Sequence, residues 1–191
     1  MKRNLISLLL FTAFLIACSS STYLIKSWTD PSVSAGTHQS FKKILAVARL
    51  KNPEYNKLAE DKMIQQFQGN VIPSYSYLMP GDSVQALVEE KLKKDGFDAV
   101  VIMKLMDINK TPSHLTGFSY GGLFGGEYGS PESWPVDVTY LVELVFYSVN
   151  NGKPLWSGTT STMNPKKFEK SLDDIIAEAK AGLKKSGLTG H

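Results

Sequence analysis

The sequence predicts an α/β fold: a mixed sheet with three parallel strands joined by helical crossovers, an antiparallel C-terminal hairpin and a final helix. Three observations lead to this prediction. Apolar runs of strand length alternate with amphipathic stretches over residues 43–107, an Asn-Gly turn separates two later apolar runs, and a long amphipathic stretch follows them. With 191 residues, 42% of them apolar, the chain is long enough for one compact domain.

The first strand and the first helix have distinct patterns. The run from Lys43 to Ala48 is almost wholly apolar, which is typical of a central strand covered on both faces. Residues 54–68 carry apolar side chains at helical spacing and are followed by a glycine, which predicts an amphipathic helix. Within this helix, Lys57 and Glu60 are interpreted as part of a solvated face.

The second strand is expected at the edge of the sheet. Residues 71–78 contain Pro73, which has no N–H to donate to an interior ladder. A helix is predicted to end near Gly96, and residues 98–107 have the composition of a third strand buried on both faces. Right-handed crossovers then give the parallel strands the order second, first, third, with the two helices on opposite faces.

The C-terminal part predicts a hairpin and a helix. Residues 138–149 and 154–163 are expected to form antiparallel strands around Asn150-Asn151-Gly152-Lys153, because Asn and Gly tolerate the positive φ of a tight turn. From Pro165 to Lys185, six apolar side chains recur on one face of a helix. This helix is predicted to pack on the sheet.

The first seventeen residues have the features of a signal peptide. Lys2 and Arg3 precede an apolar stretch, Leu5 to Ala17, that contains only two polar side chains. A helix of this length rises about 20 Å, less than the roughly 30 Å thickness of the hydrocarbon core, so a permanent membrane span is disfavoured. We therefore expect residues 1–17 to be removed during export.

The sequence Leu15-Ile16-Ala17-Cys18 resembles the lipobox of bacterial lipoproteins, whose cysteine is acylated before cleavage. Cys18 is the only cysteine in the chain and has no disulfide partner within it. The resemblance implies a diacylglycerol thioether on Cys18, and two or more acyl chains anchor a protein stably in a lipid bilayer. Residues 18–22 are then the acylated cysteine and a short tether, and residues 23–191 form a single α/β domain.

Processing would leave the protein nearly neutral. Loss of residues 1–17 removes Lys2 and Arg3 and changes the formal net charge from +3 to about +1. A charge this small does not attract nucleic acid, which is therefore not expected as a partner. Because Ser19 and not Asp follows the cysteine, the resemblance implies sorting to the outer membrane, facing the periplasm, if the source is Gram-negative.

Five motifs spread along the chain are Ser27-Trp28-Thr29-Asp30-Pro31, Phe41-Lys42-Lys43-Ile44-Leu45-Ala46-Val47, Pro73-Ser74-Tyr75, Gly96-Phe97-Asp98-Ala99-Val100-Val101 and Gly152-Lys153-Pro154-Leu155-Trp156-Ser157-Gly158. In these motifs and their order, the chain resembles a family of small bacterial envelope lipoproteins of uncharacterised function. Its order of strands and helices also resembles that of envelope lipoproteins that dock on partners, including activators of penicillin-binding proteins and the curli-secretion lipoprotein. This second resemblance concerns the fold and implies little about function.

The sequence contains no recognisable motif for catalysis, phosphate binding or metal ligation. Its three histidines have no neighbouring acid or cysteine at ligand spacing. Asp173 and Asp174 are assigned to the cap and dipole of the last helix, and Trp28 and Trp156 are expected to pack in the core or at its rim. We therefore expect no cofactor, no metal site and no enzymatic activity.

Residues 111–135 combine six glycines with five aromatic residues. Loops longer than about fifteen residues in compact domains tend to be functional or disordered, and disordered linkers are poor in aromatic residues. The candidate partner-binding residues are therefore Phe118, Tyr120, Phe124 and Tyr128.

These features favour a non-catalytic interaction domain that is anchored in the bilayer through Cys18 and binds another envelope protein or polymer. The alternative is an envelope hydrolase or small-ligand carrier with a pocket under the glycine-rich loop. A deep pocket with clustered His, Asp or Glu side chains would favour the alternative, and a shallow aromatic surface would favour the interaction domain.

Replacing Cys18 tests the predicted anchor. We expect Cys18→Ala to abolish acylation and normal processing, because the thiol is the atom that receives the diacylglycerol. Labelling with a radioactive fatty acid, followed by electrophoresis, measures both effects. A variant that still incorporates label and matures to the same size would show that the lipobox assignment is wrong.

Overall fold

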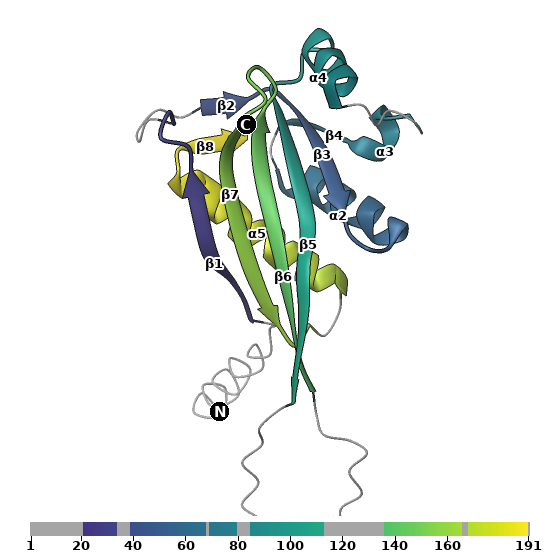
Figure 1. Ribbon diagram of the computed structural model, residues 1–191, viewed down its shortest axis with the longest axis vertical. Helices are drawn as coiled ribbons and strands as arrows, with labels where there is room; N and C mark the ends of the chain where they lie inside the picture. Colours follow the sequence, from purple (N-terminus) through teal and green to yellow (C-terminus); the bar gives the residue numbers. More distant parts are fainter. Residues whose placement is uncertain are drawn as a thin grey trace, which may run out of the picture.

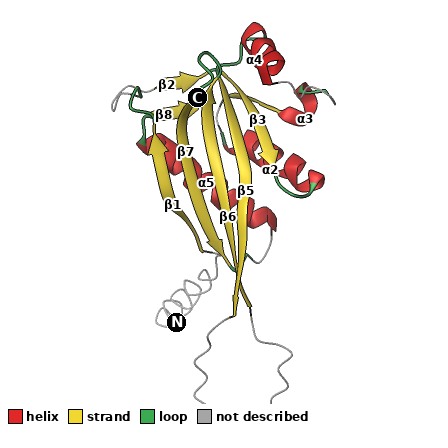
Figure 2. Ribbon diagram, in the orientation of Figure 1, coloured by secondary structure: helices red, strands yellow, loops and turns green. Residues whose placement is uncertain are grey.

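The computed structural model describes residues 21–33, 39–67, 69–79, 85–112, 136–165 and 168–190. A six-stranded sheet, in the order β1-β7-β6-β5-β3-β4, forms its centre (Figure 1). The strands are β1 (Ser21–Thr29), β3 (Lys43–Arg49), β4 (Asn70–Pro73), β5 (Ala99–Pro112), β6 (Val136–Ser148) and β7 (Pro154–Met163). The helices are α2 (Pro53–Gln66), α3 (Ser74–Tyr77), α4 (Gln85–Lys94) and α5 (Phe168–Lys185). Parallel and antiparallel strands and the C-terminal helix confirm the predicted α/β class (Figure 2).

The parallel half of the sheet has the predicted strand order. β3 lies between β4 and β5 and is parallel to both, with the Pro73 strand at the edge. The expected strand over residues 71–78 is only partly present, however, because β4 ends at Pro73 and residues 74–77 form the short helix α3. Polar contacts at the start of α3, described below, account for this early end.

The two crossover helices lie on opposite faces of the sheet, as predicted. Alternate side chains of β3 point to opposite faces. Ile44 and Ala46 belong to the larger core cluster, together with the apolar sides of α2 and α5. Leu45 belongs to a smaller cluster with Leu92 of α4 and Phe97. This double burial explains why the β3 sequence is almost continuously apolar.

The predicted hairpin joins β6 to β7. The two strands are antiparallel, and the turn is closed by hydrogen bonds from Ser148 N to Lys153 O (2.9 Å) and from Gly152 N to Ser148 O (3.0 Å). Gly152 has a φ of 67°, in the left-handed region that glycine adopts without strain.

Strand β1 begins two residues before the predicted start of the domain at residue 23, so that Ser21 and Thr22 belong to the sheet. It pairs antiparallel with β7 at the edge of the sheet. A bulge at Ile25 interrupts its register and its alternation of apolar and polar residues. A second, smaller sheet pairs β2 (Gln39–Phe41) with β8 (Leu188–Gly190) and holds the C-terminal segment beside the sheet (Figure 1).

Trp156 of β7 is packed in the core, as predicted, and is only 1% exposed. Two glycines provide the space for its ring. A Cβ atom on Gly158 would lie 2.2 Å from the ring, and one on Gly182 of α5 would lie 3.0 Å from it. Leu24 of β1 lies beside the same two glycines, so this contact joins β1, β7 and α5.

Gly158→Ala is expected to lower the free energy of unfolding by about 1–3 kcal/mol, because the added methyl group overlaps the Trp156 ring. Urea denaturation followed by circular dichroism measures this change. Ser157→Ala, at the neighbouring position on the other face of β7, serves as the control and should have little effect. Equal stability of the two variants would contradict the packing described for Trp156.

Candidate interaction surface

One face of the sheet is largely free of helices. The helices α2 and α5 lie behind the sheet in Figure 1, and on the other face α4 and the end of α3 pack only near β3 and β4. In β7, Trp156 points toward α5, so its neighbour Ser157 points to the opposite face, and Ser161 shares that face because it lies four residues further along the strand. Trp28 lies opposite Ser157, and Tyr23 lies opposite Ser161. Directly opposed residues share a face, so both aromatic side chains lie on the helix-free side, which we call the open face.

Large apolar side chains are concentrated on the open face. Met163 follows Ser161 by two residues and therefore shares its face. Two further exposed residues, Ile25 and Met106, are the extra residues of bulges in β1 and β5, where alternation does not assign a face, and they adjoin the open-face residues Lys26 and Asp107. Exposed fractions of 42% to 62% place all five largely in solvent. The open-face patch consists of Tyr23, Ile25, Trp28, Met106 and Met163. Trp28, which was expected in the core or at its rim, is not among the buried core residues and is 42% exposed on this surface.

The predicted functional residues lie outside the described residues. This applies to Cys18 and to Phe118, Tyr120, Phe124 and Tyr128. The described strands nevertheless fix where these segments join the sheet. Ser21 pairs with Met163, which pairs with Thr139, and β1 and β7 both stop at this row of residues.

Strands β5 and β6 continue beyond this row to the pair formed by Pro112 and Val136. Segment 113–135 therefore leaves and re-enters the sheet at the end where β1 begins (Figure 1). The predicted anchor and the predicted binding segment are thus connected to the same end of the domain. Thr111 and Pro112, which the sequence analysis placed in the glycine-rich loop, belong to β5.

Glu60 is buried, contrary to the expectation of a solvated face. It is 2% exposed, and its carboxylate accepts three hydrogen bonds. The donors are Ala48 N (2.9 Å), Ser74 Oγ (2.7 Å) and Tyr75 N (3.3 Å). Helical spacing alone puts Glu60 near the polar side of α2. The sequence pattern did not reveal that β4 ends early, at Pro73, and so did not reveal why Glu60 is buried. Because β4 stops opposite Ala46, β3 continues past its neighbour, and Glu60 provides the acceptor that a longer strand would have provided.

The surface next to Glu60 contains a second polar contact. Tyr75 Oη donates a hydrogen bond to Asp61 Oδ1 at 2.5 Å. This bond, together with partial burial and the negative charge nearby, raises the pKa of Tyr75 to about 12. The exposed Lys57 lies with its Nζ atom 5.2 Å from the centre of the Tyr75 ring. These contacts stabilise the junction between α2 and α3.

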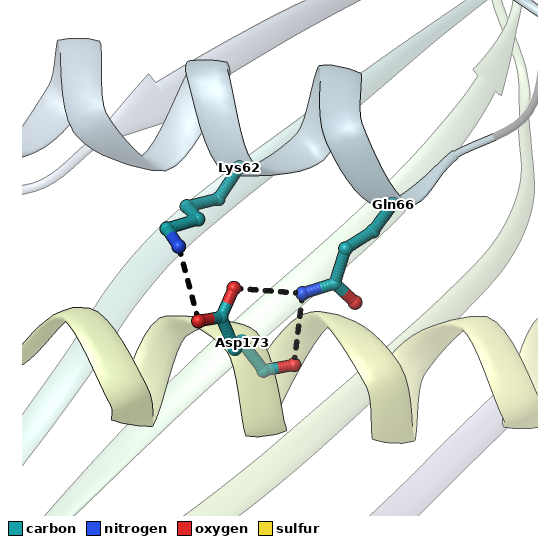
Figure 3. Close-up of polar contacts among 3 residues, drawn as sticks. All are labelled: Lys62, Gln66 and Asp173. Atoms are coloured by element: carbon teal, nitrogen blue, oxygen red, sulfur yellow. Dashed lines mark hydrogen bonds and ion pairs between the residues drawn. The ribbon is translucent and has the colours of Figure 1, made fainter.

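Asp173 joins two helices and does not cap α5. It lies five residues after the first residue of α5, and its carboxylate accepts hydrogen bonds from Lys62 Nζ (3.1 Å) and Gln66 Nε2 (3.0 Å) of α2 (Figure 3). Gln66 Nε2 also donates to the backbone oxygen of Asp173 (3.1 Å). A further bond runs from α5 to α2. Lys180 Nζ donates to the backbone oxygen of Gln66, near the C-terminal end of α2, where a cation is favourable.

No group of three or more His, Cys, Asp or Glu side chains within the described ranges is arranged to hold a metal ion. No helix among these same residues is long and apolar enough to cross a membrane. The polar clusters that the structure does contain, around Glu60 and Asp173, join elements of the fold to one another.

No family model matches the chain, and no curated protein matches its sequence. The predicted membership of an uncharacterised lipoprotein family therefore stays a prediction.

Solved structures give a fold-level likeness. The PelC dodecamer from Paraburkholderia phytofirmans has a TM-score of 0.47 at 13% identity, with 89% of this chain and 99% of that chain covered.

Lipoprotein GNA1162 from Neisseria meningitidis is similar with a TM-score of 0.44 at 16% identity, covering 75% of this chain and 98% of that chain. TolB from Acinetobacter baumannii is similar with a TM-score of 0.33 at 16% identity, covering 86% of this chain and 32% of that chain. At these scores and identities the likeness concerns the general arrangement of the fold and implies no shared activity.

Glu60→Ala is expected to lower the free energy of unfolding by about 2–4 kcal/mol, because it leaves hydrogen-bond donors near β3 and α3 without acceptors. Glu60→Gln should cost less, since one side-chain oxygen is kept. Gln65→Ala, at an exposed position of the same helix, is the control. Urea denaturation of the three variants measures the differences, and an effect of Glu60→Ala no larger than that of the control would refute the assigned role.

The contact between Tyr75 and Asp61 predicts an unusual titration. The Tyr75 phenol should ionise near pH 12, because its bond to Asp61 stabilises the protonated form. Asp61→Asn removes the charge and should lower this pKa toward the ordinary value of about 10. Absorbance titration of tyrosinate, with Tyr75→Phe to identify the signal, measures the change. An unchanged pKa in Asp61→Asn would contradict the assignment.

Proposed function

We propose that this protein is a bacterial envelope lipoprotein whose domain binds another envelope protein or polymer close to the membrane and catalyses no reaction. One observation supports the proposal most directly. The strand that follows the predicted acylation site and the two strands that flank the aromatic segment meet at the same end of the sheet. A binding segment at this end is held near the lipid surface.

The distance between the anchor and the domain is short. Ser21 is the first residue of β1, and only three Cα–Cα steps separate it from Cys18. At 3.8 Å per step, these residues span at most about 11 Å whatever their conformation. An acylated Cys18 would therefore keep the end of the sheet within about 10–12 Å of the lipid headgroups, which is the diameter of one α-helix.

The composition of segment 113–135 supports a binding role. Its glycines make any single conformation costly in entropy, so that contacts outside the segment are needed to order it. Aromatic side chains contribute large contact areas and few torsions, and they are common at the centres of interfaces. We assign these contacts to Phe118, Tyr120, Phe124 and Tyr128.

The alternative function, an envelope hydrolase or small-ligand carrier, requires converging polar groups beneath the same segment. It predicts that shortening the segment abolishes turnover or retention of a small molecule. The interaction-domain proposal predicts instead that shortening it weakens capture of a macromolecular partner. One variant therefore tests both functions.

Replacement of residues 117–129 by a short Gly-Ser linker provides this test. The melting temperature should change by only a few degrees, and co-purification of partners from detergent-solubilised envelopes should decrease several-fold. Tyr55→Ser, which changes an exposed aromatic residue on α2, is the control and should leave capture unchanged. A large loss of stability with unchanged partner capture would mean that the aromatic residues belong to the domain's own core, and the proposal would fail.

A further inference from the structure

We propose that the open face lies on the bilayer that holds Cys18, so that the open-face patch contacts lipid headgroups and the upper parts of the acyl chains. This inference rests on the proposed lipid anchor and adds the orientation of the domain. The strands would then run along the membrane surface, with α2 and α5 directed away from it.

The patch lies close to the predicted anchor. Ser21 pairs with Met163, and Tyr23 follows two residues later on β1. Tyr23 and Met163 thus lie next to the point where the tether joins the sheet. Since Cys18 is at most about 11 Å from Ser21 along the chain, the bilayer is the surface nearest to this part of the patch.

Exposed apolar side chains are distributed unevenly over the described residues. Eight large apolar residues of the described part of the chain are exposed, and five of them form the open-face patch. The other three, Tyr55, Tyr75 and Met79, lie on α2, on α3 and just after α3. The patch therefore marks one side of the domain as the side suited to an apolar surface.

The side chains of the patch also suit the surface of a bilayer. Tyr and Trp have an apolar body and a polar tip, which suits the boundary between headgroups and acyl chains. Tyr23 and Trp28 lie five residues apart on one strand, so both can reach this boundary only if β1 lies roughly parallel to the membrane. Ile25 and Met106, which adjoin the open-face residues Lys26 and Asp107, are exposed as well.

The charges on the open face are compatible with lipid. Glu143 lies directly opposite Lys104, and Arg49 lies opposite Lys104 on its other side, so this row of the open face carries no excess of negative charge. The carboxylate of Asp107 accepts a hydrogen bond from the backbone N–H of Ile108 at 2.7 Å. Lys26 lies opposite the uncharged Thr159 and is placed to approach headgroup phosphates.

Site-specific fluorescence tests the proposed orientation. Cys18 is the only cysteine of the chain and is consumed by acylation, so an introduced cysteine is the only free thiol of the mature protein. Tyr23→Cys and Trp28→Cys place an environment-sensitive fluorophore on the open face. Ala177→Cys places it at an exposed position of α5, across the sheet, and serves as the control.

The acylated, labelled proteins are reconstituted in vesicles of phosphatidylethanolamine and phosphatidylglycerol, with and without lipids that carry a nitroxide quencher in the acyl chain. We expect blue-shifted emission and several-fold stronger quenching at positions 23 and 28 than at position 177. Thermal unfolding of each labelled variant, compared with the parent protein, establishes that the domain is intact.

Three results would overturn the proposal. Quenching at position 23 without quenching at position 28 would mean that the domain stands upright on its anchor. A blue shift at both positions without quenching by lipid would mean that protein, such as a second copy of the chain, covers the patch. Equal quenching at all three positions would mean that the domain has no preferred orientation. Failure of the anchor itself is distinguished by mass spectrometry of each protein, because the acyl chains on Cys18 are detected whether or not the domain lies on the vesicle.

Discussion

The packing of α2 and α5 against one face of the sheet determines which face keeps its side chains exposed. The two helices are joined by the contacts of Asp173 with Lys62 and Gln66 and by the bond from Lys180 to the end of α2. Both helices bury apolar side chains in the same large cluster as Trp156. Because these helices cover one side of the sheet, and α4 and the end of α3 pack on the other side only near β3 and β4, much of β1, β7 and β6 carries no helix on its outer side.

A second constraint operates at the opposite edge of the sheet. β4 is four residues long, and Glu60 completes the hydrogen bonding of β3 beyond its end while also binding the start of α3. A buried carboxylate is tolerated at this position because each of its oxygens accepts at least one hydrogen bond. The short edge strand and its helical continuation leave little of this edge open to another strand. The other edge of the sheet is formed by the long strand β1, which carries Tyr23 and Trp28 of the open face.

The sequence was sufficient to predict the elements whose patterns are continuous. β3 and α5 follow directly from an apolar run and from helical spacing. β1 was missed because its bulge at Ile25 breaks the alternation, and Glu60 was misassigned because helical spacing does not reveal where a neighbouring strand ends. For the candidate site, composition identified segment 111–135, but the open-face patch comes from three strands whose register is set only by tertiary pairing.

The protein's own helices cover one face of the sheet, and we propose that the bilayer covers the other. Peroxide oxidation of methionines in intact envelopes, measured by mass spectrometry, tests it most directly. Met63 and Met103 are fully buried, Met79 lies just after α3, outside the patch, and is 72% exposed, and Met106 and Met163 belong to the patch. The account predicts fast oxidation of Met79, slow oxidation of Met106 and Met163, and almost none of Met63 and Met103. Oxidation of Met106 and Met163 as fast as that of Met79 would contradict it.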